Sequence, residues 1–237
     1  QVAVEALAKR EREGAWRLMA MQVAHEIKNP LTPIKLGTQQ LQRAWSDDQP
    51  DFDARLKRHC EVVIQQIDVL TEIAHDFSSL AAIGLDKLEP VDICEVLMES
   101  ASLYRSANTS IDWELNGLDE RHEIPATRSH LLRVFNNLIS NAVDAVGQSE
   151  NPSIVLTVVK SGSLLQIDVT DNGHGISADQ MELIFEPRFT TKGSGTGLGL
   201  TITQSIIDQL NGRLEVDSDS NVGTRFRALF TQDVIGH

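Results

Sequence analysis

Residues 24–45 have the sequence AHEIKNPLTPIKLGTQQLQRAW. Apolar or small residues recur alternately three and four positions apart through it and just before it, at Ala20, Ala24, Ile27, Leu31, Ile34, Thr38, Leu41 and Trp45. This spacing is the heptad pattern of a helix that packs along one seam. The turn-forming residues SDDQPD at 46–51 then interrupt the pattern. The seam therefore predicts a helix that ends near Trp45.

A second seam with the same spacing follows the turn, at Leu56, Cys60, Val63, Ile67, Leu70, Ala74, Phe77 and Ala81. Two long helices joined by a short polar loop predict an antiparallel hairpin, and residues 1–19 also have a helical pattern. A lone hairpin leaves half of its apolar surface in water, so we predict that two chains pair into a four-helix bundle.

The pattern changes near residues 84–86. Alternating apolar residues predict strands near 88–91, 111–115, 154–158, 165–169 and 224–230, and apolar stripes of helical spacing predict helices over 94–104, 129–146 and 198–210. Strands and helices interspersed without a strict βαβ rhythm favour an α+β domain with helices on one sheet face. We therefore predict two domains, residues 1–85 and residues 86–237.

The composition excludes several classes of protein. The 237 residues carry a net charge of −13, most of it after residue 85, which argues against a nucleic-acid binder. No apolar run is long enough to span a membrane, and no signal-like segment is present. Cys60 and Cys94 lack metal-binding spacing, so we expect two buried thiols in a reducing compartment. The start at Gln1 rather than Met suggests a piece of a longer protein.

His25 lies one position after the seam residue Ala24, a rotation of about 100° around the helix. It is therefore expected on the flank of the hairpin, although a helical histidine is often only a core residue. A zinc HExxH motif is excluded, because Asn29 stands where the second His is needed. An exposed imidazole beside Glu26 suits nucleophilic attack, with the carboxylate orienting the ring or accepting its proton. Glu26 could equally be a solvated surface residue.

Three polar motifs mark the second domain. Asn137 and Asn141 share one helix face and could hold Mg²⁺ beside phosphates. The stretch DNGHGI, residues 171–176, directly follows a predicted strand, which would place Asp171 at a pocket floor to accept a hydrogen bond from an exocyclic amine. The stretch GSGTGLGL, residues 193–200, leads into a helix and could bind phosphates with its N–H groups. Neither a Walker loop nor a Rossmann fingerprint fits it. Each motif alone is a weak signal.

Taken together and in this order, the motifs resemble those of the sensor histidine kinases of two-component systems. The His box covers 25–31, the N box 137–141, the first Gly box 171–176, the F box 185–192 and the second Gly box 195–200. Residues 25–34 and the short lid at 185–192 look most like the nitrogen-regulation kinases of NtrY/NtrB type.

The resemblance implies a dimerisation and histidine-phosphotransfer hairpin, residues 1–85, that forms a dimeric four-helix bundle. An α/β sandwich ATP-binding domain of the Bergerat (GHKL) fold, residues 86–237, would follow it. The implied cofactors are ATP and Mg²⁺. The implied partners are a second copy of the chain, a response-regulator receiver domain and upstream sensor domains, with no nucleic acid. We expect the cytoplasmic portion of a protein, with anchoring of its parent in the bacterial inner membrane left open.

The resemblance also assigns roles to residues. His25 would be the phosphoacceptor, Glu26 its base, and Asn29 the residue that orients water for phosphatase action. The implied nucleotide-binding residues are Asn137, Asn141, Asp171, Gly173, Gly175, Lys192, Gly195, Thr196, Gly197, Leu198, Gly199 and Thr224. Among them, Asn141 would hold Mg²⁺ with the ATP phosphates, Asn137 is a second candidate for the metal, Asp171 would bind the adenine amine, and Lys192 would reach the terminal phosphate from the lid.

Two positions depart from the family pattern. Arg188 stands where an aromatic residue is common, and Asp144 where some members have Lys. The alternatives are a conformational ATPase of the Hsp90-like or DNA-repair type, a catalytically dead scaffold that only docks a regulator, and an enzyme in which phosphatase action dominates. The sequence gives neither the signal, nor the cognate regulator, nor whether phosphorylation occurs within or between chains.

Overall fold

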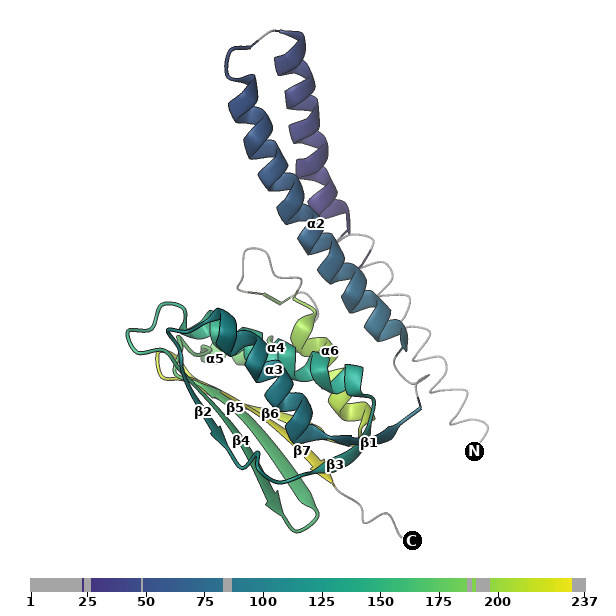
Figure 1. The fold of residues 1–237 in the computed structure, drawn as a ribbon, viewed down its shortest axis with the longest axis vertical. Coiled ribbons are helices and arrows are strands. Elements are labelled where there is room, and N and C mark those ends of the chain that lie inside the picture. The colour runs from purple at the N-terminus through teal and green to yellow at the C-terminus, as the bar shows by residue number, and fades with distance from the viewer. Residues whose placement is uncertain are drawn as a thin grey trace. The chain divides into compact units, whose positions relative to one another are not determined.

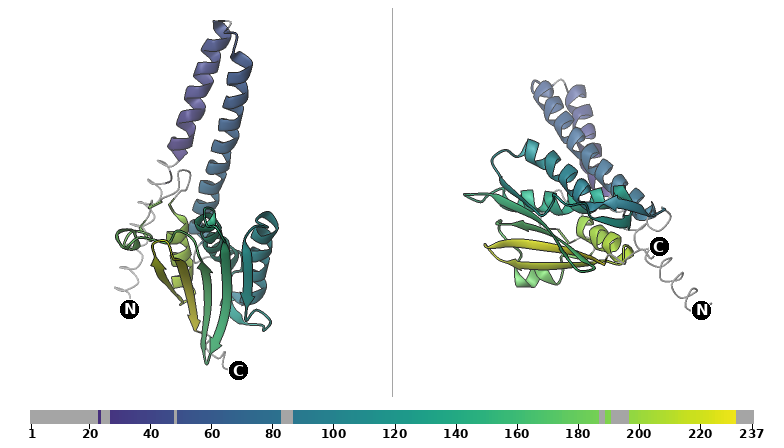
Figure 2. Two further views of the ribbon diagram at one scale, coloured as in Figure 1. Left: turned by 90° about the vertical axis from the view of Figure 1, so that its left-hand side faces the viewer. Right: turned by 60° about the horizontal axis from the view of Figure 1, so that its bottom comes forward.

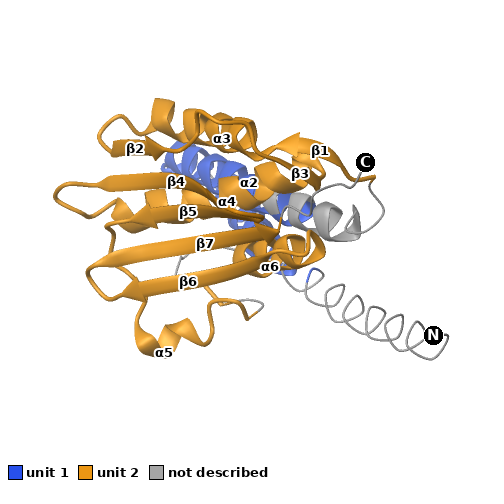
Figure 3. Ribbon diagram, turned by 90° about the horizontal axis from the view of Figure 1, so that it is seen from below, with its two compact units in different colours: residues 1–81 blue, residues 82–237 orange. Residues whose placement is uncertain are grey.

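The computed structural model describes residues 23, 27–47, 49–82, 87–186, 189–190 and 197–231. The chain divides into two compact units, residues 1–81 and residues 82–237, which Figure 3 shows in different colours. His25, Glu26, Arg188, Lys192, Gly195 and Thr196 lie outside the described residues.

The first unit is a helical hairpin. Residues 27–46 are helical, and α2 (Phe52–Ala82) runs back alongside them (Figure 1). The Trp45 and Phe52 rings meet edge to face, 5.3 Å between centroids, at the loop end of the hairpin. These elements confirm the helical hairpin predicted from the two seams, and pairing of two hairpins remains a prediction.

A second contact joins the hairpin helices about two turns from the loop. The Thr38 hydroxyl donates to the Ile34 carbonyl at 2.8 Å, so its oxygen accepts from His59 Nε2 at 3.1 Å. A Cβ on Gly37 would lie 2.2 Å from His59 Nδ1, so the glycine makes room for this imidazole. The hairpin therefore has a close, polar crossing point as well as an apolar seam.

The second unit contains a five-stranded sheet. Its strand order is β2–β4–β5–β7–β6, with β2 (Asp112–Asn116) parallel to β4 (Ser153–Ser161) and all other pairs antiparallel. The remaining strands of this sheet are β5 (Leu164–Asp171), β7 (Gly223–Thr231) and β6 (Arg213–Asp219). The strands β1 (Glu89–Asp92) and β3 (Glu123–Ala126) form a separate antiparallel pair.

Three helices cover one face of the five-stranded sheet: α3 (Ile93–Ala107), α4 (Arg128–Val146) and α6 (Gly199–Gln209) (Figure 2). A short helix, α5 (Ala178–Met181), follows β5. The inward residues of β4, β5 and β7 alternate with less buried ones and pack with the helices into one buried core. Its members include Ile154, Leu156, Leu165, Ile167, Phe230, Leu131, Phe135, Leu138 and Ile202.

This architecture confirms an α/β layer of Bergerat type after a helical hairpin. Sequence reasoning missed β3, β6 and α5. The strand β3 contains Pro125, and β6 is an edge strand whose charged residues hide its alternation.

The expectation of two buried thiols is right for Cys94 and wrong for Cys60, which is exposed because one hairpin covers only part of each helix. No helix in the described part of the chain is both long and apolar enough to cross a bilayer.

Candidate functional site

The polar face of α4 connects the predicted motifs of the second unit. Asn137, Asn141 and Ala145 follow one another at four-residue spacing, so they share a face over about 12 Å of helix. At one end, Asn137 Nδ2 donates to Thr203 Oγ1 of α6 at 2.8 Å. At the other, the Ala145 carbonyl accepts from the backbone N–H of His174, at 3.2 Å. Asn141 lies between the head of α6 and the first Gly box.

Asp171 ends β5 and is only 7% exposed. Its Oδ1 accepts from the Gly173 N–H at 2.8 Å, and the Thr224 N–H also hydrogen-bonds the carboxylate. Burial raises the pKa of Asp171 above its ordinary value, and the two N–H groups only partly offset this effect. A desolvated carboxylate of this kind is a strong hydrogen-bond acceptor. An amine of a bound ligand would donate to it and replace the hydrogen bonds to water that burial removes.

The loop after Asp171 needs glycine because backbone approaches it closely. A Cβ on Gly173 would lie 2.4 Å from the Ala145 carbonyl oxygen, so a larger residue would push the loop off α4. Gly175 has φ +68°, and a Cβ there would meet the Asp219 carbonyl oxygen at 2.0 Å. These contacts hold the first Gly box between α4 and the end of β6.

Thr224 pairs with Asp171 across β5 and β7 and is itself buried. Ser218 of β6 supports it, since the Ser218 hydroxyl donates to the Gly223 carbonyl at 2.8 Å and accepts from the Ile176 N–H at 2.9 Å. With its proton used in this way, Ser218 Oγ accepts from Thr224 Oγ1 at 3.0 Å. Sequence reasoning missed Ser218, and it had no signal for it because β6 itself was not predicted.

The second Gly box is described from Gly197 onward. Gly197 has φ +66°, Leu198 is buried, and Gly199 begins α6 without a side-chain cap. An uncapped helix start presents N–H groups and the positive end of the helix dipole, which suits phosphate. This end of α6 meets Asn137, so the N box and the second Gly box lie together.

The side-chain oxygens near α4 decide what kind of metal site the unit could form. No group of three or more His, Cys, Asp or Glu side chains gathers within the described ranges, so those residues offer no carboxylate cage. Magnesium needs only one or two protein oxygens when phosphates and waters complete its shell. The amide oxygens of Asn137 and Asn141 fit that requirement. The larger set of protein ligands that an all-protein metal site uses is therefore not needed here.

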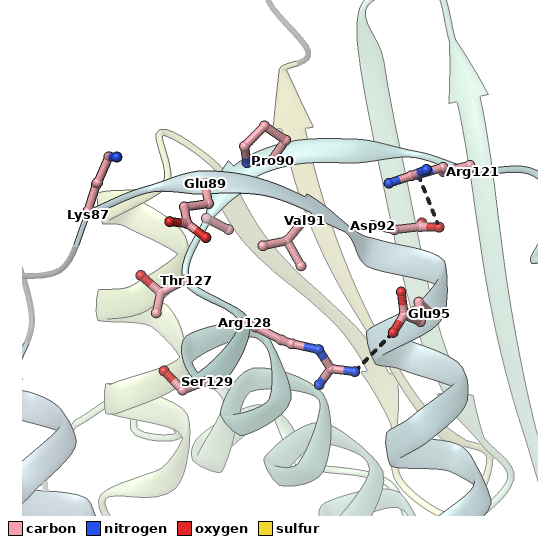
Figure 4. A pocket seen from close by; sticks show the side chains of 11 residues that line it. Lys87, Glu89, Pro90, Val91, Asp92, Glu95, Arg121, Thr127, Arg128 and Ser129 are labelled. Carbon is pink, nitrogen blue, oxygen red and sulfur yellow. Dashed lines mark hydrogen bonds and ion pairs between the residues drawn. The ribbon is translucent and has the colours of Figure 1, made fainter.

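A separate hollow of about 510 Å³ lies between β1, the start of α4 and α3 (Figure 4). None of the predicted site residues lines it. Its arginines already have acidic partners: Arg121 lies 3.9 Å from Asp92, and Arg128 lies 3.2 Å from Glu95. The pairing of both arginines leaves Lys87 as the remaining cation among the described lining residues, and none of the motif residues lies there, so the candidate site is the one around α4.

The remaining predicted residues are placed as follows. Asn29 is exposed on the first hairpin helix, and Asp144 is exposed on α4. The structure brings Asn137 and Gly199 together, as it does Asp171, Gly173 and Thr224.

Two family models match the chain. Residues 15–85 match the His Kinase A (phospho-acceptor) domain, and residues 126–234 match the histidine kinase-, DNA gyrase B- and HSP90-like ATPase family. Together they cover the hairpin and most of the α/β unit, and the second match supports ATP as a ligand. The phospho-acceptor match disfavours the Hsp90-like alternative, which has no such hairpin.

Curated relatives agree. The sensor histidine kinase ZraS of Escherichia coli O157:H7 is 34% identical over 228 residues, which are 95% of this chain and 48% of that protein. The nitrogen regulation protein NtrY of Azorhizobium caulinodans is 28% identical over 229 residues, covering 89% of this chain and 28% of that protein. The chain thus spans about half the length of ZraS, and less of NtrY.

Solved structures show the same folds. The catalytic domain of the histidine kinase ThkA is 29% identical and matches 62% of this chain and 97% of its own, with a TM-score of 0.55. A longer ThkA structure, 23% identical, covers 94% of this chain and 64% of its own with a TM-score of 0.71, which supports the fold of both units. With its phospho-acceptor hairpin, its ATPase-type domain and its NtrY-like similarity, the chain belongs to the sensor histidine kinases of two-component systems.

Proposed function

We propose that ATP bound around α4 phosphorylates His25, and that the phosphoryl group then passes to an Asp of a response-regulator receiver domain. The observation that carries this proposal is the row of Asn137, Asn141 and Ala145 on α4, which links the head of α6 to the loop after Asp171. The matched phospho-acceptor hairpin supplies the acceptor on the same chain.

Each end of the row would bind one end of the nucleotide. Asp171 would accept the adenine amine, with Gly173, Gly175 and Thr224 shaping the base side. Gly197, Leu198 and Gly199 would meet the phosphates together with Gly195, Thr196 and Lys192. Asn141, with Asn137 as a second ligand, would hold Mg²⁺, which neutralises charge on the phosphate oxygens.

At the acceptor, an imidazole nitrogen of His25 would attack the γ-phosphorus. A P–N bond forms as the P–O bond to ADP breaks, and Glu26 takes the imidazole proton. Catalysis would rest chiefly on positioning and charge neutralisation, as in phosphoryl transfer generally.

The partners follow from the same family. A second copy would pair with the hairpin, since seam residues such as Leu31 and Ile67 are exposed in one chain. A response regulator would receive the phosphoryl group, and the matching longer ThkA structure is a complex with the response regulator protein TrrA. Upstream sensor domains belong to the proposal for the full-length protein.

Incubation with γ-labelled ATP and Mg²⁺ tests the proposal. We expect an acid-labile label on the chain that His25→Ala abolishes. His59→Gln is the matched control, because it changes a hairpin histidine outside the His box and should leave the label in place. An unlabelled wild-type chain, or a label that survives His25→Ala, would contradict histidine phosphorylation.

A phosphatase role is a second candidate, supported by the exposed position of Asn29 one helical turn after His25. Its carboxamide could orient water toward a phosphorylated regulator. Asn29→Ala should then prolong regulator phosphorylation without loss of autophosphorylation, and an unchanged lifetime would remove this role.

A further inference from the structure

Thr203 is a buried polar residue to which no motif assigns a role. It lies on α6, is 1% exposed, and its hydroxyl accepts a hydrogen bond from Asn137 Nδ2 at 2.8 Å. A buried hydroxyl is costly unless it is hydrogen-bonded, so a bond between two different helices at this depth fixes both partners. The bond spans 66 positions of sequence and joins α4 to α6.

Gly199 completes the surroundings of the same carboxamide. A Cβ on Gly199 would lie 2.2 Å from Asn137 Oδ1 and 2.9 Å from its Cγ. Gly199 is the first residue of α6 and has no left-handed backbone angle, so its missing side chain is explained by space and not by conformation. The glycine therefore leaves room for Asn137.

These two contacts hold the carboxamide in place between α4 and α6. Its nitrogen points to Thr203, and its oxygen rests over the Cα of Gly199, where α6 begins. The carboxamide thus stays at the helix start that suits phosphate.

We propose that Thr203 is a positioning residue of the nucleotide site: with the space left by Gly199, its hydroxyl holds the Asn137 carboxamide in place and fixes the start of α6 against α4. This inference rests on the proposed function, because it assumes that nucleotide phosphates bind at the head of α6. Thr203 itself touches neither nucleotide nor metal and acts through Asn137.

The test is equilibrium binding of a non-hydrolysable ATP analogue with Mg²⁺ to the whole chain. Thr203→Val keeps the shape of the side chain and removes the acceptor, so affinity should fall about five-fold, the loss of one net hydrogen bond. Thr203→Ser keeps the hydroxyl and should bind within about two-fold of wild type. Ser205→Ala, which removes a hydroxyl elsewhere on α6, is the control and should bind like wild type.

A double-mutant cycle separates positioning from simple stability. Once Asn137→Ala has removed the carboxamide, Thr203→Val should have no further effect on affinity, because there is nothing left to position. Gly199→Ala should weaken binding at least as much as Thr203→Val, since its methyl group displaces Asn137. The unfolding temperature without nucleotide is measured alongside each affinity.

Three outcomes would overturn the inference: Thr203→Val binds like wild type, Thr203→Ser binds no better than Thr203→Val, or Thr203→Val weakens binding equally with and without Asn137. Failure of the wild-type chain to bind the analogue would instead overturn the proposed function. The two failures are therefore distinguishable in one set of titrations.

Discussion

The hairpin and the α/β unit differ in how far a single chain buries their apolar residues. In the α/β unit, Phe135 and Leu138 of α4 are almost completely buried within a single chain. In the hairpin, the seam residues Leu31 and Ile67 remain 47% and 51% exposed. The α/β unit therefore buries its core within one chain. The hairpin leaves an apolar face exposed, and a partner hairpin would cover that face. The contrast matches the proposed division of roles, in which the α/β unit binds the nucleotide by itself and the phosphoacceptor hairpin depends on dimerisation.

The core of the α/β unit should be sensitive to truncation at any concentration. Phe135→Ala removes a fully buried ring and should lower the free energy of unfolding by about 3–5 kcal/mol. Calorimetry at two protein concentrations should give the same loss. A loss that grows on dilution would mean that this core also depends on a partner, and the contrast would fail.

Substitutions in the seam of the hairpin should act mainly on the association of two chains. Ile67→Glu places a charge in the predicted bundle core and should weaken dimerisation by at least about 100-fold, because an unpaired buried charge costs several kcal/mol. Gln65→Glu adds the same charge at an exposed position off the seam, and it should leave the dimer intact. Sedimentation equilibrium measures both, and a monomeric wild type at micromolar concentration would refute the predicted bundle.

The nucleotide site should be separable from the core that carries it. Asp171→Asn keeps the size of the side chain and should weaken nucleotide binding at least about ten-fold, because a hydrogen bond to a charged acceptor is lost. The unfolding temperature at pH 7 should change by only a few degrees. An Asp171→Asn chain that no longer folds would make Asp171 a structural residue.

The same variant gives a pH test. Burial raises the folded-state pKa of Asp171, so the folded state binds its proton more readily than the unfolded chain does. That contribution to stability is present at low pH and is lost as the pH rises through the raised pKa. Wild type should therefore gain stability relative to Asp171→Asn as the pH falls from 7 toward the ordinary value of 3.8. The opposite trend would argue against a desolvated carboxylate.

The two thiols report the smallest difference between the units. Burial and the nearby charges of Asp92 and Glu120 raise the pKa of Cys94 to about 11, so at pH 8 a thiol reagent should leave it unmodified until the chain unfolds. Cys60 is exposed in one chain and lies on the seam, so it should react quickly when dilute and more slowly as dimers form. A rate for Cys60 that does not depend on concentration would place it outside the dimer interface.

Periodicity predicted the elements that have one apolar face, such as the hairpin helices, α4 and β5. It could not predict β6, whose outward Arg213, Glu215 and Asp217 pair with arginines or with each other and mask the inward Leu214. A heptad seam also indicates that a helix face is covered, but it does not indicate whether the same chain or a partner chain covers it. This explains why Cys60 was expected to be buried and is exposed in one chain.

The candidate site divides in the same way. Motif order made Asp171, Asn137 and the glycines candidates for the site, because each motif is a short local stretch of sequence. Ser218 and Thr203 depend on contacts between distant strands and helices, and no local pattern marks them. Gly199 was expected to line phosphates, and the structure adds a second reason for it, the space occupied by Asn137.

The division of roles can be tested on the intact protein. A chain with a protease site inserted between residues 84 and 85 is incubated with γ-labelled ATP and Mg²⁺, cleaved at neutral pH, and separated into its two fragments. We predict that the acid-labile label is carried only by the fragment containing His25, and that nucleotide binding stays with the fragment containing Asp171. Label on the α/β fragment, or none on the hairpin fragment of a chain that binds nucleotide, would contradict a kinase in which one unit binds ATP and the other accepts its phosphoryl group.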